Sequence, residues 1–225
     1  MVFKMKKLSN EDITLIYRIV IAGLIWFTMI SSPILSVLSG STILDATVSF
    51  FLRFIAFTMQ TNFFVVLWFT IAIALQLLDK QEILEKISGS LKGAIMLYIT
   101  ITFVFFSLLL APFFISRNFA GFFSLGNIVL HYIAPIAFIA DFFIIDGKLT
   151  ENKVRYEWKH LPYWFIYPVF YFIFGAIIEI TTGNAIYWFI ALGSGPLIYW
   201  LFVFLLFFTG SLIAYFYIRV SRKRE

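Results

Sequence analysis

Residues 122–145 read FFSLGNIVLHYIAPIAFIADFFII, a long apolar run that contains one imidazole ring, that of His131. An α-helix needs about 20 apolar residues to cross roughly 30 Å of hydrocarbon, and this run is long enough. Similar runs recur along the chain, which is 62% hydrophobic and 13% charged, with a mean hydropathy of +0.96. None of them alternates apolar and polar residues as the strands of a membrane barrel do. The sequence therefore predicts an all-α membrane protein.

We predict one domain over residues 1–225, built as a bundle of six transmembrane helices. The spans are placed at 13–38, 50–78, 92–114, 122–145, 161–180 and 196–219. The segment TTGNAIYWFIALGSG, residues 181–195, is apolar but short and rich in glycine, so we expect it in the membrane interface rather than as a seventh span. The first span lacks the small-residue cleavage site of a signal peptide and is expected to be retained.

Lysine and arginine predict the orientation, because cytoplasmic loops carry an excess of both. Of the 17 such residues, all except Arg18, Arg53 and Arg117 fall in the N-terminus, two loops and the tail that share one side of the predicted topology. Both termini are therefore expected in the cytoplasm. Arg18 lies inside the first span, and we expect it to extend its charged group toward water. Topology and anionic headgroups account for the net charge of +5, so no nucleic-acid partner is expected.

Polar side chains also interrupt the second span, where AFTMQTNF (residues 56–63) contains Thr58, Gln60, Thr61 and Asn62. At about 1.5 Å per residue, Thr58 is expected roughly 12 Å below the outer surface. The same arithmetic places His131 of the fourth span and Tyr171 of the fifth about 13 Å deep. Pro135 and Pro168, one turn from His131 and Tyr171, should kink their helices. A cavity lined by polar groups is therefore expected in the outer half of the membrane.

A threonine and a histidine at one depth can act as nucleophile and general base. Neutral His131 would take the proton of Thr58, and Asn62 or Gln60 would donate to the developing oxyanion. Thr61, one turn deeper, is an alternative nucleophile. The plainer interpretation is also open, since intramembrane threonines often bond to their own helix and amides often join helices.

The group that orients His131 could be Asn127, Tyr171 or Glu179. Asp141 and Asp146 lie toward the cytoplasmic end of the fourth span, and we expect them to be solvated. The chain has no cysteine, and its only other histidine, His160, lies in a loop, so no metal site is expected. No phosphate-binding loop or known hydrolase motif is present, and no cofactor is expected.

Three stretches resemble the signatures of a bacterial six-span family, the Pr-six-Pr integral membrane proteins. They are FLRFIAFTMQTNFFVV (51–66), GNIVLHYIAPIAFIADFF (126–143) and PYWFIYPVFYFIFGAIIE (162–179). That family is similar to the eukaryotic androgen-induced-gene group, membrane threonine hydrolases that cleave fatty acid esters of hydroxy fatty acids. The resemblance implies that Thr58 and His131 form the catalytic pair and that the protein resides in a bacterial cytoplasmic membrane. The spacing from His131 to Pro135 and the Gln60–Asn62 extension depart from the eukaryotic pattern.

The sequence thus predicts an intramembrane lipid ester hydrolase whose partners are membrane lipids or an acyl-ester substrate. Two alternatives stay open. One is a small transporter or lipid-binding protein with a polar site in the membrane, and the other is a structural protein whose polar residues only pack helices.

Overall fold

The computed structural model describes residues 9–149 and 155–222, and these residues are almost entirely helical, with no β-strand among them. Six stretches of helix are long and apolar enough to cross a membrane. Each of them overlaps one of the six predicted spans, so the prediction of an all-α transmembrane bundle is confirmed. Some of the basic residues behind the predicted orientation lie outside the described residues: Lys4, Lys6, Lys7, Lys153, Lys223 and Arg224.

The first half of the chain forms four α-helices: α1 (Asn10–Leu38), α2 (Ile43–Arg53), α3 (Phe57–Leu77) and α4 (Gln81–Ile87). The start of α1 is fixed by a capping box, in which the Ser9 hydroxyl accepts from the Asp12 backbone N–H and the Asp12 carboxylate accepts from the Ser9 backbone N–H. Thr42 caps α2 in the same way by accepting from the backbone N–H of Asp45.

The third span is a continuous rod made of η1 (Ser88–Lys92), α5 (Gly93–Phe105), η2 (Phe106–Leu110) and α6 (Ala111–Arg117). After the short α7 (Phe119–Phe122), the fourth span comprises α8 (Leu125–Ile128), η3 (Val129–Ile133), α9 (Ala134–Ala140) and η4 (Asp141–Leu149). The remaining elements are η5 (Trp158–His160), α10 (Leu161–Thr182), η6 (Trp188–Ile190), η7 (Leu192–Ser194) and α11 (Pro196–Arg222).

The second predicted span, 50–78, is wrong as a single helix. α2 ends at Arg53, and residues 54–56 turn the chain before α3 begins at Phe57. Thr58 therefore lies in the first turn of α3 rather than eight residues inside a continuous helix. The backbone N–H groups of such a first turn have no partner within the helix.

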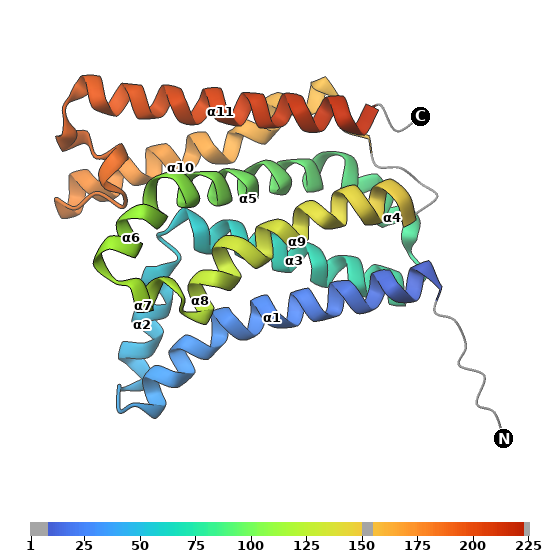
Figure 1. Ribbon diagram of the computed structural model, residues 1–225, viewed down its shortest axis with the longest axis horizontal. Coiled ribbons are helices and arrows are strands. Elements are labelled where there is room, and N and C mark those ends of the chain that lie inside the picture. Colours follow the sequence, from blue (N-terminus) through green and yellow to red (C-terminus); the bar gives the residue numbers. More distant parts are fainter. Residues whose placement is uncertain (1–8, 150–154, 223–225) are drawn as a thin grey trace.

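α5 is the central helix of the bundle. Every residue from Gly93 to Thr102 is buried, because α3 and α9 pack on one side and α10 and α11 on the other (Figure 1). Trp164 of α10 packs directly onto Gly93, where a side chain would collide with the indole, and its ring N–H donates to the carbonyl of Ser90 at 2.9 Å. α1 lies on the far side of α3, and α1 begins at the end of the bundle where α11 finishes (Figure 1).

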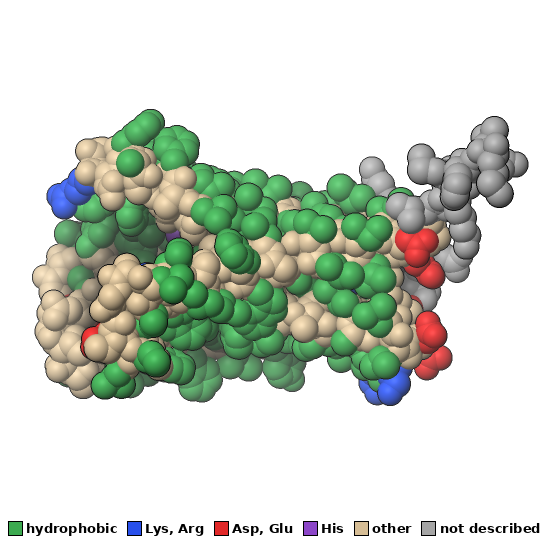
Figure 2. Space-filling view, turned by 90° about the horizontal axis from the view of Figure 1, so that it is seen from below, with side chains coloured by type: hydrophobic (Ala, Val, Ile, Leu, Met, Phe, Trp, Pro, Cys, Tyr) green, Lys and Arg blue, Asp and Glu red, His purple; other side chains and the backbone are tan. Residues whose placement is uncertain are grey.

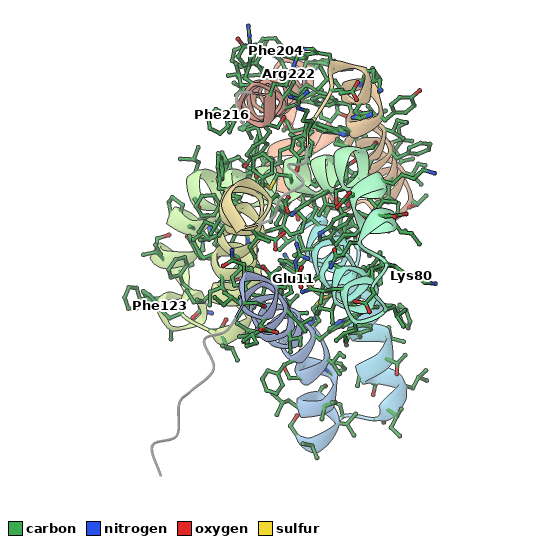
Figure 3. The ribbon with its side chains drawn as sticks, turned by 90° about the vertical axis from the view of Figure 1, so that its right-hand side faces the viewer. Glu11, Lys80, Phe123, Phe204, Phe216 and Arg222 are labelled. Atoms are coloured by element: carbon green, nitrogen blue, oxygen red, sulfur yellow. The ribbon has the colours of Figure 1, made fainter. Side chains whose placement is uncertain are left out.

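The outer surface of the bundle matches a lipid environment. Figure 2 shows a long side that is mainly apolar, with the charged side chains gathered at the two ends. The view along the bundle in Figure 3 shows Phe123, Phe204 and Phe216 at its periphery, and each of these side chains is exposed. Large apolar side chains facing outward on every side are expected of helices solvated by acyl chains.

Candidate functional site

Thr58 lines a narrow cavity of about 50 Å³ between α3, α5 and α10. The other walls are almost entirely apolar or aromatic and include Phe57, Thr102, Phe106, Pro168, Tyr171 and Phe189. The segment between α10 and α11 contributes to these walls, so this segment packs into the bundle and does not form a seventh span. The cavity can hold a slender apolar group beside a hydroxyl.

Tyr187, which the sequence did not single out, closes the polar side of this cavity. Its hydroxyl accepts from the backbone N–H of Phe57 at 3.1 Å and interacts with the side chains of Thr58 and Tyr171. The Tyr171 hydroxyl donates to the carbonyl of Ile55 at 2.9 Å. Burial raises the pKa of Tyr187, so its hydroxyl keeps its proton at neutral pH. α3 has no side-chain cap, and a tyrosine from a distant segment therefore satisfies its first N–H group.

Asn62 joins α3 to the helix that carries His131. The amide is fully buried, and its nitrogen donates to the carbonyls of Thr58 and Leu130, each at 2.8 Å. Its oxygen has no hydrogen-bond partner among the described residues. Thr61 is also fully buried, and its hydroxyl pairs with that of Thr102 on α5 at 2.8 Å.

His131 lies in the π-helical turn η3, one turn before Pro135, the residue expected to distort this helix. Its Nδ1 is 3.1 Å from the carbonyl of Asn127. A carbonyl can only accept, so Nδ1 carries the proton and Nε2 has the free lone pair of a base. π-Helical turns inside α-helices occur frequently at functional sites.

Phe106 separates His131 from the cavity in this conformation. The two rings stack with centroids 3.5 Å apart and an angle of 16° between their planes. Phe106 lines the cavity and His131 does not, and no hydrogen bond joins Thr58 to His131 in the described part of the chain. The structure thus brings Thr58, Tyr171 and Tyr187 together and holds the imidazole behind one phenyl ring.

The remaining predicted site residues form hydrogen bonds that involve backbone groups. Gln60 donates to the carbonyl of Phe54 at 2.5 Å and accepts from the Tyr167 hydroxyl at 2.8 Å, which stabilises the turn between α2 and α3. Of the three candidates for orienting His131, Asn127 does so, through its backbone carbonyl. Glu179 instead accepts from the backbone N–H groups of Leu192 and Gly193, at 2.7 and 3.0 Å.

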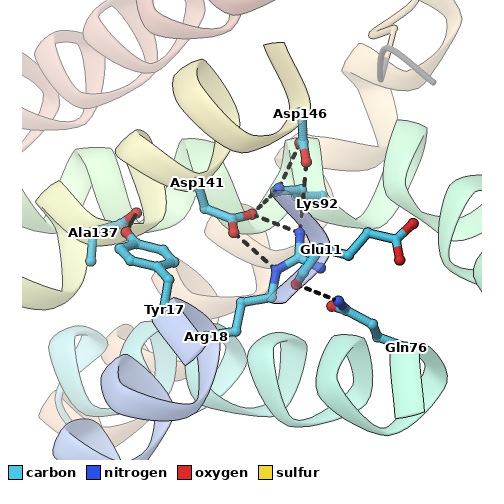
Figure 4. A network of polar contacts seen from close by, with 8 residues as sticks. All are labelled: Glu11, Tyr17, Arg18, Gln76, Lys92, Ala137, Asp141 and Asp146. Carbon is cyan, nitrogen blue, oxygen red and sulfur yellow. Dashed lines mark hydrogen bonds and ion pairs between the residues drawn. The ribbon is translucent and has the colours of Figure 1, made fainter. Parts of the chain in front are cut away.

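Four charged side chains form a second polar centre, and here the sequence interpretation was wrong. Arg18 does not extend to water, and Asp141 and Asp146 are not solvated. Lys92, the first residue of the predicted third span, lies against both aspartates. All four are at most 5% exposed. Figure 4 shows them together, with dashed lines for their hydrogen bonds and ion pairs. These charged side chains can be buried because they pair with one another. Opposite charges and hydrogen bonds replace the water that would otherwise hydrate them.

The contacts of this charge cluster join three spans. Arg18 Nε lies 3.0 Å from Asp141 Oδ1, and Lys92 Nζ lies 2.6 Å from Asp146 Oδ2 and also contacts Asp141. The Lys92 ammonium is 5.9 and 5.8 Å from the ring centroids of Trp68 and Phe138. Two positive and two negative groups leave the cluster neutral, which suits a site inside a membrane bundle.

Neither this cluster nor the cavity offers a metal site. No group of three or more histidine, aspartate or glutamate side chains that could hold a metal ion occurs among the described residues. Comparisons with protein-family models, with curated proteins and with solved structures gave no match for this chain.

Proposed function

We propose that this protein is an intramembrane lipid ester hydrolase in which Thr58 is the nucleophile and His131 the general base. The observation that carries the proposal is the position of the Thr58 hydroxyl, at the uncapped start of a helix and on the wall of an apolar cavity. The Nδ1–H bond to Asn127 leaves His131 Nε2 available to accept a proton.

The oxyanion donors in this proposal are backbone groups rather than side-chain amides. The nitrogens of Asn62 and Gln60 already donate to carbonyls, so both residues act by positioning. The first turn of α3 instead supplies the Phe57 N–H group, whose present partner is the hydroxyl of Tyr187 on the cavity wall, together with the positive end of the helix dipole. When substrate binds, the ester oxygen would replace the Tyr187 hydroxyl as the acceptor of the Phe57 N–H group.

In the reaction, the Thr58 oxygen attacks the ester carbonyl while its proton moves to His131 Nε2. The C–O bond to the alcohol breaks, the alcohol leaves with that proton, and an acyl-threonine ester remains. Water, deprotonated by the same imidazole, then hydrolyses this ester and restores Thr58. The proton transfer requires Phe106 to rotate out of its stacked position, since it covers the ring.

The wider proposal follows the sequence resemblance. We assign the chain to the Pr-six-Pr family, related to the androgen-induced-gene hydrolases, with fatty-acyl esters as substrates and a role in lipid metabolism. A bacterial cytoplasmic membrane with both termini inside is the location that the distribution of basic residues supports. The start of α1 and the finish of α11 at one end of the bundle agree with this orientation (Figure 1).

A second candidate is a lipid-binding or transport protein that uses the same cavity without chemistry. Its support is the absence of a hydrogen bond between Thr58 and His131 in the described residues, together with the phenyl ring that divides them. In that case the Thr58 hydroxyl would only bind a polar group of the lipid.

Turnover of long-chain nitrophenyl esters by the purified protein separates the two candidates. The hydrolase proposal predicts that Thr58→Val abolishes turnover, while Thr47→Val leaves it unchanged. Thr47 is a suitable control because its hydroxyl bonds only to the carbonyl of Ile43 in its own helix. Turnover that persists in Thr58→Val would contradict the proposal, and ester binding without turnover in the wild type would favour the lipid-binding candidate.

A further inference from the structure

A polar hollow of about 430 Å³ lies at the end of the bundle where α1 begins and α11 finishes. It is far from the cavity at Thr58, and the residues that line it are Arg155, Tyr156, Glu157, Trp158, Lys159 and Arg222. Among the described residues of its walls, three cations and one carboxylate give an excess of two positive charges. A hollow of this volume lies within the size range of small-molecule sites, about 300–1,000 Å³.

The walls of this hollow are held in place from the protein interior. Tyr156 is fully buried, its backbone N–H donates to the Ser221 hydroxyl at 2.9 Å, and its ring stacks on Phe142 with centroids 5.1 Å apart. Because Tyr156 is fixed between α11 and η4, the residues on either side of it are held beside Arg222. The backbone that carries Arg155 is therefore in place before any ligand arrives, which lowers the entropic cost of binding.

Glu157 is the one acidic residue among the described residues that line the hollow, and its ionisation reflects the basic groups around it. Glu157 lies 2.8 Å from Lys159, and both side chains are largely exposed. The hydrogen bond from Lys159, with the nearby charges of Lys159, His160 and Arg222, holds the pKa of Glu157 below its usual range. Trp158, which packs against Tyr215 at 5.7 Å, adds the amphipathic ring that membrane proteins favour at headgroup depth.

We propose that this hollow binds the phosphate of an anionic phospholipid headgroup. Arginine matches phosphate oxygens with paired N–H donors, and clustered basic side chains at the ends of membrane spans attract anionic headgroups. The position at one end of the span bundle puts the hollow where headgroups lie, and the aromatic ring of Trp158 marks that same level. A free phosphate ion has the same chemistry, and it is the alternative source of the ligand.

The test compares two charge-matched variants of the full-length protein in neutral detergent. Lys159→Gln/Arg222→Gln removes two cations from the hollow, whereas Lys80→Gln/Lys86→Gln removes two exposed cations elsewhere at the same end. Figure 3 shows Lys80 and Arg222 on separate sides of this end. The probes are short-chain phosphatidylglycerol, short-chain phosphatidylcholine and inorganic phosphate, and Arg222→Lys is a third variant that retains the charge.

The proposal predicts that the dissociation constant for phosphatidylglycerol rises roughly tenfold or more in Lys159→Gln/Arg222→Gln. This dissociation constant should change less than twofold in the Lys80→Gln/Lys86→Gln control. In Arg222→Lys it should rise by less than in Lys159→Gln/Arg222→Gln, because lysine keeps the charge and loses the paired N–H donors. Competition by inorganic phosphate would identify the free ion as a ligand, and the absence of competition would identify the lipid headgroup. Equal weakening in both charge-removal variants, or binding of phosphatidylcholine as tight as that of phosphatidylglycerol, would overturn it.

Discussion

Phe106 stacks face to face on His131, with the ring centroids 3.5 Å apart, and the same phenyl ring lines the cavity that contains Thr58. One side chain thus separates the proposed base from the proposed nucleophile. Both rings lie in π-helical turns, η2 and η3, where an extra residue per turn changes the direction of the side chains. The contact makes Phe106 the residue whose movement controls the proposed chemistry.

Replacing Phe106 with alanine should increase ester turnover. The phenyl ring would no longer cover His131, and the imidazole would gain access to the cavity. Turnover per folded molecule is the quantity to measure, because removal of a buried phenyl ring also costs stability, about 3–5 kcal/mol in soluble cores. Phe106→Leu, which keeps apolar volume, should fall between the wild type and the alanine variant. A folded Phe106→Ala protein with lower turnover would show that the ring assists the reaction instead of blocking it.

Removing the amide of Asn62 should loosen the contact between α3 and η3. Asn62→Leu loses two hydrogen bonds to carbonyls and leaves both carbonyls buried, and we expect a cost of about 1–2 kcal/mol. Thermal unfolding in detergent measures this change. The control is Asn184→Ala, in an exposed turn with local bonds only, which should alter stability by about 0.5 kcal/mol or less. Equal effects of the two changes would mean that Asn62 does not join the helices.

The stability of the protein should depend on the balance of charge in the cluster more than on any single contact within it. Lys92→Met leaves two buried carboxylates with Arg18 alone, and such an unpaired charge costs about 3–5 kcal/mol. Lys92→Met/Asp146→Asn restores neutrality and should recover most of that loss. Stability in detergent is the measurement, with Lys80→Met as the exposed control. A double variant that is no more stable than Lys92→Met would refute the role of charge balance.

Close packing of α10 on α5 depends on the absence of a side chain at Gly93. Gly93→Ala would push a methyl group into the Trp164 indole, and overpacking of this kind costs about 1–3 kcal/mol. Gly23→Ala is the matched control, because nothing lies within 4 Å of a methyl group at that position of α1. Alanine is the better helix former, so the control should gain about 0.5–1 kcal/mol. If both variants gain stability, the Trp164 contact does not limit the packing.

Much of the fold could be predicted from the sequence, because each apolar run long enough to span a membrane must satisfy its own backbone as a helix. The break at residues 54–56 was not predicted, since those residues are as apolar as their neighbours and contain neither glycine nor proline. The groups freed at this break are satisfied in part by the hydroxyls of Tyr171 and Tyr187, and residues so far apart in sequence carry no local signal of their contact.

The charge cluster was missed for a different reason. Each of its residues lies near the end of a span, where a charged side chain by itself is expected to reach water. The sequence did contain a signal, because Arg18 lies five residues into the first predicted span, 13–38, and Asp141 lies four residues from the end of the fourth, 122–145, which runs in the opposite direction. At about 1.5 Å per residue these positions share a depth, so opposite charges could have been matched across the bundle.

The most direct test of the central claim is covalent labelling of the detergent-solubilised protein with a fluorophosphonate probe, followed by mass mapping of the modified residue. The account predicts modification at Thr58 that is retained in Thr61→Ala and lost in Thr58→Ala and His131→Ala. Modification that maps to Thr61, or labelling that is equally strong in Thr58→Ala, would contradict the assignment of Thr58 as the nucleophile.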